Sequence, residues 1–314
     1  MQVGELRGTR STRKCPQLFG VEIEVENVLS YDWLLGNEWW SVKGDGSLRD
    51  NGREFVSNPL HYRDARAALR QYYQEASRLQ YQPSVRTGIH IHMDMRWRTM
   101  EQVAAICALY SALEPALFDL CGPEREEGIY CVPWYRSTDD VRMLREMRDC
   151  TSPDQARALA EATCKYSALY LEPLMRFGTI EFRAAPTYHT EAEMLRWLHA
   201  VRRVVRVGSM LGTVERVVEL CDTRMERMLR LVMGSATPAM LKAIEQCDSL
   251  GVATLLIRIR QSDPWRMSGE TALPSTRGYR DFVQRDAYPT RRMAPPPIYQ
   301  DYEPDPEDYD DEEI

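Results

Sequence analysis

The chain has 314 residues, of which 44% are hydrophobic and 28% charged, proportions typical of soluble globular proteins. No segment is long and apolar enough to predict a membrane-spanning helix, and the polar N-terminus lacks the apolar stretch of a secretory signal. The formal net charge is −7, but nine acidic residues fall within residues 301–314, so residues 1–300 carry a net charge of +2. This balance gives no indication of a nucleic-acid partner.

The eight cysteines are scattered along the chain and never lie within nine residues of one another. This spacing excludes a Cys-x-x-Cys pair, and with it a zinc knuckle or a thioredoxin-type motif. Scattered thiols are typical of a reducing compartment, so we expect a cytoplasmic protein. Nothing in the composition indicates an oligomeric state.

The pattern of polar and apolar residues predicts strands early in the chain and helices between and after them. Residues 1–16 are expected to form a flexible arm and residues 17–60 strands and turns. The later elements, in chain order, are a helix over Tyr62–Leu79, a strand over Val85–Met93, a helix over Met100–Leu120 that starts after Thr99, helices over Ser137–Arg148 and Pro153–Cys164, a hairpin of Leu169–Leu174 and Thr179–Ala184 around Phe177-Gly178, and helices over residues 190–232 and 237–260, with a break near Gly208 and Gly212.

This order of elements predicts an α+β fold with a largely antiparallel sheet. Residues 17–262 are expected to form one globular domain. After Ser262 prolines and acidic residues prevail, and such a segment buries too little apolar surface to offset its ordering entropy. We therefore expect residues 263–314 to form a Pro-rich segment and a disordered acidic tail.

Reactive side chains occur two residues apart on several of the expected strands. The pairs are Glu22 with Glu24, His90 with His92, and Glu181 with Arg183, and Glu54 lies on a fourth strand. In a strand, residues i and i+2 share a face, and the intervening residues of these segments are aliphatic or aromatic. One sheet is therefore expected to bury its apolar face and to offer the polar face to ligands.

Glu22 and Glu24 would lie about 7 Å apart on one face, a repulsive arrangement unless cations separate them. Divalent ions such as Mg²⁺ or Mn²⁺ prefer such oxygen ligands. The alternative is a solvated outer strand face, and Glu26, which extends the acidic run, favours that alternative.

His90 and His92 suit a metal or phosphate site, although buried histidines also occur as structural residues. Glu181 and Arg183 are equally consistent with a salt bridge within the sheet, but an arginine beside metal-bound carboxylates also neutralises a transferring phosphoryl group. Carboxylates outnumber imidazoles, which indicates Mg²⁺ or Mn²⁺ rather than a closed zinc site. The chain has neither a Walker loop nor a dinucleotide glycine fingerprint, so any nucleotide is expected to be held mainly through metals.

Taken together, these segments resemble the amidoligase family of the carboxylate-amine ligase superfamily, whose wider relatives are glutamine synthetase and glutamate-cysteine ligase. The resemblance covers residues 17–200. It rests on Phe19-Gly-Val-Glu-Ile-Glu24, Asp45-Gly-Ser47, Glu54-Phe-Val-Ser-Asn-Pro-Leu60, Thr87-Gly-Ile-His-Ile-His-Met93, Ile129-Tyr-Cys131, Lys165-Tyr166 and Gly178-Thr-Ile-Glu-Phe-Arg183. It implies a glutamine synthetase-like antiparallel sheet with helices packed on one face, and an amidoligase catalytic domain over residues 17–262.

The resemblance also implies a role for each site residue. Glu22, His90 and Glu181 would share the metal nearer the phosphates of ATP. Glu24 and Glu54, with Asp45, would hold a second metal nearer the carboxylate substrate. His92 would lie close to the transferring phosphate, and Arg183 would contact it as a catalytic group.

Candidate substrate contacts are Arg125, Tyr130 and Tyr170, although Pro123-Glu-Arg125 equally fits a surface turn. Two departures from the family pattern stand out: Asp45 takes the place of a further glutamate, and Tyr170-Leu171 that of an Asn-Leu pair.

The activity implied by the resemblance is ATP-dependent formation of an amide or isopeptide bond through an acyl phosphate, with two or more Mg²⁺ or Mn²⁺ ions. Its substrates would be a carboxylate and an amine, from amino acids, peptides or other amine-bearing components. Phages and bacteria both carry such enzymes, and a phage-encoded one would act in the host cytoplasm. Two alternatives stay open: a metal-dependent hydrolase, which needs no ATP, and a catalytically silent interaction protein that binds through the acidic tail.

Overall fold

The computed structural model describes residues 2–3, 18–34, 37–77, 83–122, 125, 128–137 and 140–233. The predicted helix over residues 237–260 and the predicted tail over residues 263–314 lie outside this range. Of the predicted N-terminal arm, residues 2–3 are described, and they lie against the body: Val3 is fully buried and its amide donates to the Arg98 carbonyl at 2.9 Å.

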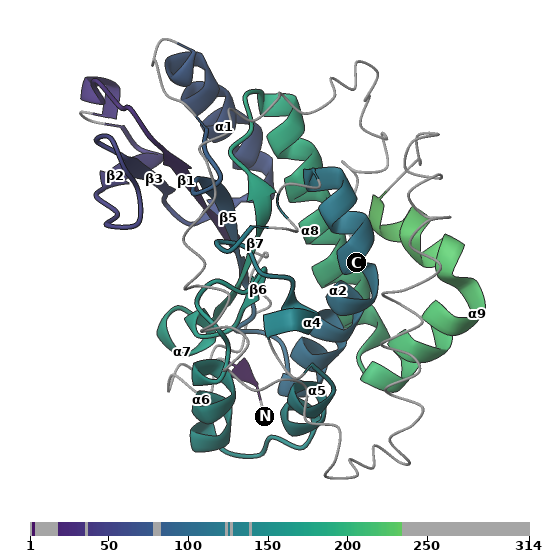
Figure 1. Ribbon diagram of the computed structural model, residues 1–314. Coiled ribbons are helices and arrows are strands. Elements are labelled where there is room, and N and C mark those ends of the chain that lie inside the picture. Colours follow the sequence, from purple (N-terminus) through teal and green to yellow (C-terminus); the bar gives the residue numbers. More distant parts are fainter. Residues whose placement is uncertain are drawn as a thin grey trace.

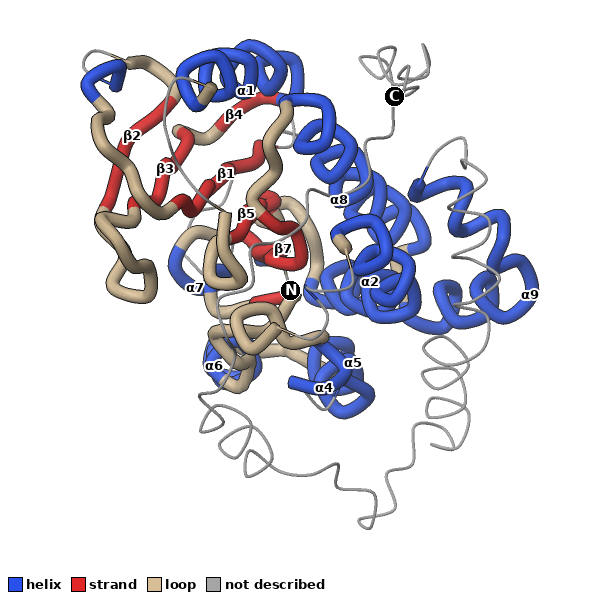
Figure 2. The backbone as a smooth tube through the Cα atoms, turned by 45° about the horizontal axis from the view of Figure 1, so that its top comes forward, coloured by secondary structure: helices blue, strands red, loops and turns tan. Residues whose placement is uncertain are grey.

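Within the described residues, seven strands form one sheet in which every strand pair is antiparallel (Figures 1 and 2). Six strands follow the order β2-β3-β1-β5-β7-β6, and β4 pairs with β1. The strands are β1 (Leu18–Val25), β2 (Trp40–Lys43), β3 (Arg53–Ser57), β4 (Leu60–His61), β5 (Gly88–Asp94), β6 (Leu169–Tyr170) and β7 (Thr179–Pro186). The predicted antiparallel sheet is therefore confirmed.

One face of the sheet is apolar because the aliphatic residues of its central strands alternate with polar ones. Val21, Ile23, Ile89, Ile91 and Phe182 are fully buried on this face. The ladders set them side by side, pairing Ile23 with Ile89 and Ile91 with Phe182. The side chains predicted for the opposite face are therefore held on that face, because a slip of one residue would move them into the core.

Helices cover the apolar face (Figure 2). Tyr72 of α1 contacts Phe55 of β3 with ring centroids 5.5 Å apart, and Tyr110 of α2 contacts Phe182 of β7 at the same distance. The helices are η2 (Asp32–Leu34), α1 (Tyr62–Ala76), α2 (Met100–Cys121), α4 (Trp134–Ser137), α5 (Asp140–Arg148), α6 (Pro153–Glu161), α7 (Pro173–Arg176), α8 (Glu191–Leu211) and α9 (Val214–Met233). As predicted, α2 starts after Thr99, whose side chain forms a capping box with Gln102.

The predicted hairpin over residues 169–184 is confirmed only in part. Leu169–Tyr170 does pair antiparallel with β7, but Pro173–Arg176 forms a helical turn rather than a strand. Pro173 lacks the amide that a strand ladder needs and favours the first turn of a helix. The chain then enters β7 through Gly178, whose φ of 74° suits glycine.

The predicted break in the C-terminal helices lies at Gly212 and not at Gly208. Gly212 ends α8 with a φ of 77°, the left-handed conformation common after a helix. Gly208 lies inside α8, where an added Cβ would come 2.7 Å from the Cα of Ile106 in α2. Glycine is therefore needed at 208 for the close approach of two helices.

Replacing Gly208 by alanine is expected to lower the free energy of unfolding by about 1–3 kcal/mol, because the methyl group overpacks the α2–α8 contact. Urea unfolding checks this. Gly44→Ala is the control, since a Cβ at Gly44 meets nothing within 4 Å, and its effect should stay within about 0.5 kcal/mol. Equal effects of the two substitutions would contradict the packing role of Gly208.

Among the residues the structure describes, no helix combines the length and apolar character that crossing a membrane requires. Six of the scattered cysteines fall within this part of the chain, and all six are free thiols.

Candidate active site

The polar face of the sheet gathers the predicted side chains from four neighbouring strands. The ladders place Glu24 opposite Glu54, Glu22 opposite His90, and His92 opposite Glu181. We call the resulting group the polar cluster; its members are Glu22, Glu24, Asp45, Glu54, His90, His92, Glu181 and Arg183.

His90 lies at the centre of the polar cluster and is 3% exposed. Its Nδ1 lies 3.3 Å from Oε1 of Glu181 and 3.5 Å from Oε2 of Glu22, and its Nε2 lies 3.6 Å from Oε2 of Glu24. Glu24 and Glu181 are themselves 5% and 4% exposed. A solvated outer strand face is therefore excluded for Glu24, and Glu26 is also buried, accepting the Arg49 amide at 2.9 Å.

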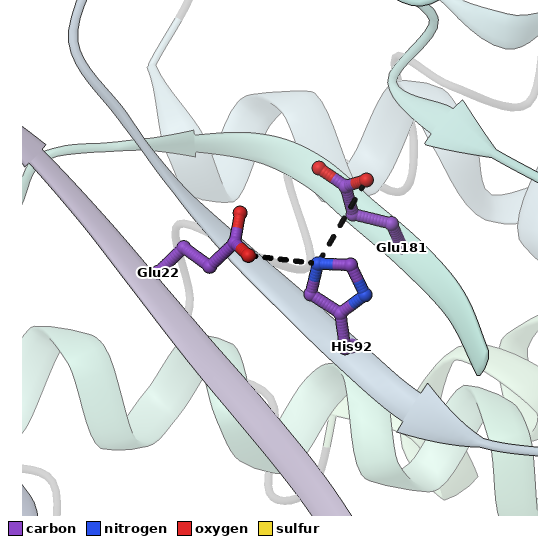
Figure 3. Close-up of side chains that lie close together, drawn as sticks. All are labelled: Glu22, His92 and Glu181. Atoms are coloured by element: carbon purple, nitrogen blue, oxygen red, sulfur yellow. Dashed lines mark ion pairs between the residues drawn. The ribbon is translucent and has the colours of Figure 1, made fainter. Parts of the chain in front are cut away.

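His92 bridges two carboxylates from the strands on either side of it (Figure 3). Its Nε2 lies 3.4 Å from Oε1 of Glu22 and 3.8 Å from Oε2 of Glu181. Its Nδ1 lies 3.1 Å from the Thr179 hydroxyl, which fixes the ring orientation. The imidazole thus presents Nε2 to the carboxylates.

Three overlapping groups in the polar cluster place their potential ligand atoms within 4.8 Å of one another. They are Glu22–His92–Glu181, Glu22–Glu54–His90 and Glu24–Asp45–Glu54. Among the described residues, the buried atoms His90 Nδ1 and His92 Nε2 have no hydrogen-bond partner. Crowded carboxylates, with two buried imidazole nitrogens 3.3–3.8 Å from them but not hydrogen-bonded, form a donor set that fits divalent cations.

The grouping agrees only in part with the one that the resemblance implies. Glu24, Asp45 and Glu54 lie together as expected. The group around Glu22 and Glu181 contains His92, although His90 was expected there and its Nδ1 also reaches Glu181. The division of these ligands between individual ions stays a prediction.

Charges within the polar cluster shift several pKa values. Burial raises the pKa of Glu54 to about 8, and the neighbouring charges of Glu22 and Glu24 act in the same direction. Burial opposes ionisation of Glu22, but its close interactions with His90 and His92 outweigh burial and hold its pKa far below the usual range. Near neutral pH and without cations, Glu54 therefore retains a proton.

For His92 and Asp45, the effect of neighbouring groups on the pKa exceeds the effect of burial. Burial lowers the pKa of His92, yet Glu22 and Glu181 raise it overall. Burial would raise the pKa of Asp45. However, its carboxylate accepts hydrogen bonds from the amide and the hydroxyl of Ser47, both at 2.7 Å, and these bonds lower the pKa below the usual value. The Asp45–Ser47 turn thus holds an ionised carboxylate at the edge of the polar cluster.

Glu54 gives a prediction for the metal-free protein. Because its pKa of about 8 exceeds its usual value of 4.5, its contribution to stability is complete below pH 4.5 and is lost as the pH rises through about 8. Glu54→Gln mimics the protonated form, so the Tm of the variant relative to the parent should rise between pH 6 and pH 9, by about 3 °C or more.

Thermal melts in EDTA check this, with the exposed Glu38→Gln as control. Saturating Mg²⁺ should make the Tm of Glu54→Gln lower than that of the parent, since the variant lacks one carboxylate ligand for the metal. A constant Tm difference across the pH range would contradict the crowding of Glu54.

Arg183 lies beside these carboxylates and is 9% exposed. Its Nη1 forms an ion pair with Glu181, and its Nε has no hydrogen-bond partner among the described residues. Burial lowers the pKa of the guanidinium, but the charges of Glu181 and Glu24 raise it overall, so Arg183 stays positively charged.

A cavity of about 370 Å³ opens beside Glu22 and His92. Its walls also include Gly20, Arg96 and Phe177, and Asp94 binds Arg96 through two hydrogen bonds of 2.9 Å. This cavity was not predicted from the sequence. The available signal was Asp94, which continues the i, i+2 series of His90 and His92 along β5.

The three predicted substrate contacts occupy different places. Tyr170 lies opposite Glu181 in the β6–β7 ladder, and burial with the charges of Glu172 and Glu181 raises its pKa. Tyr130 packs against Tyr166 with ring centroids 5.9 Å apart, and Arg86 lies over its ring. The guanidinium of Arg125 is buried against backbone carbonyls, so Arg125 is not part of an exposed surface turn.

Comparison with known protein families defines the class of this chain. Residues 17–205 match the family described as "Putative amidoligase enzyme". The match covers more than half of the chain, which therefore belongs to this amidoligase family. A comparison with curated protein sequences gives no match. The family resemblance expected from the strand motifs is thus confirmed.

Proposed function

We propose that the protein is an ATP-dependent carbon–nitrogen ligase that joins a carboxylate to an amine through an acyl phosphate, on a sheet of the glutamine synthetase type. The observation that carries this proposal is the polar cluster: buried carboxylates, two imidazoles and a charged arginine meet on one sheet face beside a cavity, in a chain of the amidoligase family. We further propose that the reaction takes place in the cytoplasm.

Two or more Mg²⁺ or Mn²⁺ ions fit the donor set. Glu22, His90 and Glu181 would hold one ion, and Glu24, Glu54 and Asp45 another. His92 lies beside Glu22 and would therefore be close to the first ion. When bound, such ions neutralise phosphate oxygens and align the reacting groups.

The residues of the chain have distinct tasks in this proposal. The cavity beside Glu22 and His92 would receive the nucleoside part of ATP, which places the phosphates against the polar cluster. Arg183, charged and aimed from β7, would grip the transferring phosphoryl group through its planar fork. The burial of His90, Glu24 and Glu181 excludes water, which would otherwise hydrolyse an acyl phosphate.

The bond changes follow from this arrangement. A carboxylate oxygen attacks the γ-phosphorus, the bond from that phosphorus to the bridging oxygen breaks, and ADP leaves. The amine nitrogen then attacks the acyl carbon, phosphate leaves with the bonding electrons, and the amine proton passes to a base. Substrate classes consistent with this chemistry are amino acids, peptides and other amine-bearing components.

A phosphorus-NMR assay tests the proposal with the full chain, ATP, Mg²⁺, and pools of carboxylates and amines. We expect ADP and phosphate to appear only when both pools are present. Formation of AMP and pyrophosphate contradicts an acyl phosphate. Consumption of amides or esters without ATP identifies a metal-dependent hydrolase, and the absence of any turnover or Mg²⁺ binding identifies an interaction protein.

A further inference from the structure

Strand β7 has one residue more than β5 at the centre of the polar cluster. The β5–β7 register changes between two successive pairs, Ile89↔Ala185 and Ile91↔Phe182. Two residues of β7, Arg183 and Ala184, therefore face the single residue His90. This arrangement is a β-bulge, which interrupts the ladder and redirects the side chains of the bulged strand. The bulge thus sets the direction of Arg183 relative to His90.

A bulge leaves backbone groups that need other partners, and Arg125 supplies them. Its Nε donates to the Ala184 carbonyl at 3.1 Å, its Nη2 to the Arg183 carbonyl at 3.1 Å, and its Nη1 to the Thr87 carbonyl at 3.0 Å. Arg125 is 4% exposed, so these bonds are shielded from water. One planar guanidinium therefore ties both bulge carbonyls to the residue that precedes β5.

Gly88 leaves the space that this guanidinium occupies. An added Cβ at Gly88 would lie 2.9 Å from Nη2 of Arg125 and 3.2 Å from the Ala185 carbonyl oxygen. Gly88 is the first residue of β5 and precedes His90 by two positions. The glycine before the His-x-His pair is thus explained by the arginine that packs against it.

We propose that Arg125 is a positioning residue, which fixes the bulge so that Arg183 and His90 face the same phosphoryl group. In this role Arg125 acts through the backbone and touches no substrate. The role replaces the substrate contact that we expected from the sequence. The effect of Arg125 on catalysis rests on the proposed function. Its effect on the bulge can be measured without any substrate.

Arg125→Lys in the full chain tests this inference, because an ammonium group offers its donors from one point and lacks the fork that reaches three separated carbonyls. Arg142→Lys, on the exposed surface of α5, is the matched control. Three properties are measured: amide hydrogen exchange over residues 88–94 and 179–186, the NMR signals of labelled histidine rings, and the kcat and KM for ATP in acyl-phosphate trapping.

We expect exchange at the bulge to rise at least about tenfold and the His90 signals to shift, with the rest of the sheet still protected. Turnover should fall at least about tenfold in kcat, with KM for ATP within about threefold of the parent. Exchange and histidine signals equal to those of the control overturn the proposal. A uniform loss of protection across the sheet also overturns it, since Arg125 would then serve overall stability alone.

Gly88→Ala is a second variant if Arg125→Lys does not fold. Its methyl group should displace the guanidinium and loosen the same residues of β5 and β7, and an unchanged bulge in Gly88→Ala overturns the proposal. If the bulge and the His90 signals respond but neither parent nor variant forms an acyl phosphate, the positioning role is supported and the proposed function fails.

Discussion

Replacing both Glu22 and Glu24 by glutamine is expected to abolish ATP turnover, by a factor of about a thousand or more, while the chain stays folded. The substitution removes the two charges that raise the pKa of Glu54, and relief of this repulsion offsets the interactions with His90 and His92 that Glu22 loses. It also removes ligand atoms from all three groups that fit a cation. Thermal melts and ATP turnover are measured together.

The melts distinguish loss of metal from loss of fold. Mg²⁺ with ATP should stabilise the parent, because a ligand that binds only the folded state raises Tm, but should leave the Tm of the double variant unchanged. The control removes two exposed carboxylates, in Glu38→Gln with Glu101→Gln, and should behave like the parent. A double variant that gains as much stability from the ligands as the parent would show that the metal assignment is wrong.

Replacing Arg183 by lysine is expected to lower acyl-phosphate formation at least about a hundredfold, with Mg²⁺-dependent nucleotide binding within a few-fold of the parent. Arginines that contact a transferring phosphoryl group contribute about 10³ to 10⁵ in rate in other enzymes, and lysine keeps the charge without the planar fork. Trapping with hydroxylamine measures the acyl phosphate, and calorimetric titration measures nucleotide binding.

The control for this prediction is Arg202→Lys in α8, where a guanidinium carbon lies 4.0 Å from the ring centroid of Tyr62. This variant should keep full trapping activity. Full activity in Arg183→Lys as well would reduce Arg183 to a structural partner of Glu181. Loss of metal and nucleotide binding together in Arg183→Lys would mean that the Glu181–Arg183 pair mainly holds the strand in place.

The part of this site that was predictable from the sequence follows from strand geometry. Alternation with period two places Glu22 and Glu24, or His90 and His92, on one face, and the buried aliphatic residues between them fix which face it is. The same alternation, continued to Asp94, places a further carboxylate on the polar face, where it lines the cavity.

The remainder depends on contacts that alternation does not encode. Arg125 bonds to Thr87 and to the carbonyls of the bulge at residues 183–184, which are distant in the sequence, and a bulge breaks the period-two pattern at that point. The place of Gly208 likewise depends on Ile106 in another helix. Which histidine joins which carboxylate follows from ring orientation, and the Thr179 hydroxyl sets it for His92.

Transfer of oxygen from carboxylate to phosphate is the most direct test of the proposed ligase reaction. With a pool of ¹⁸O-labelled carboxylates, amines, ATP and Mg²⁺, an acyl phosphate passes one labelled oxygen to the phosphate released, and phosphorus NMR resolves that species by its shifted signal. We expect each phosphate formed with amide to carry one ¹⁸O. Phosphate without label, formed at the same rate with or without carboxylates, would contradict the reaction proposed for the polar cluster.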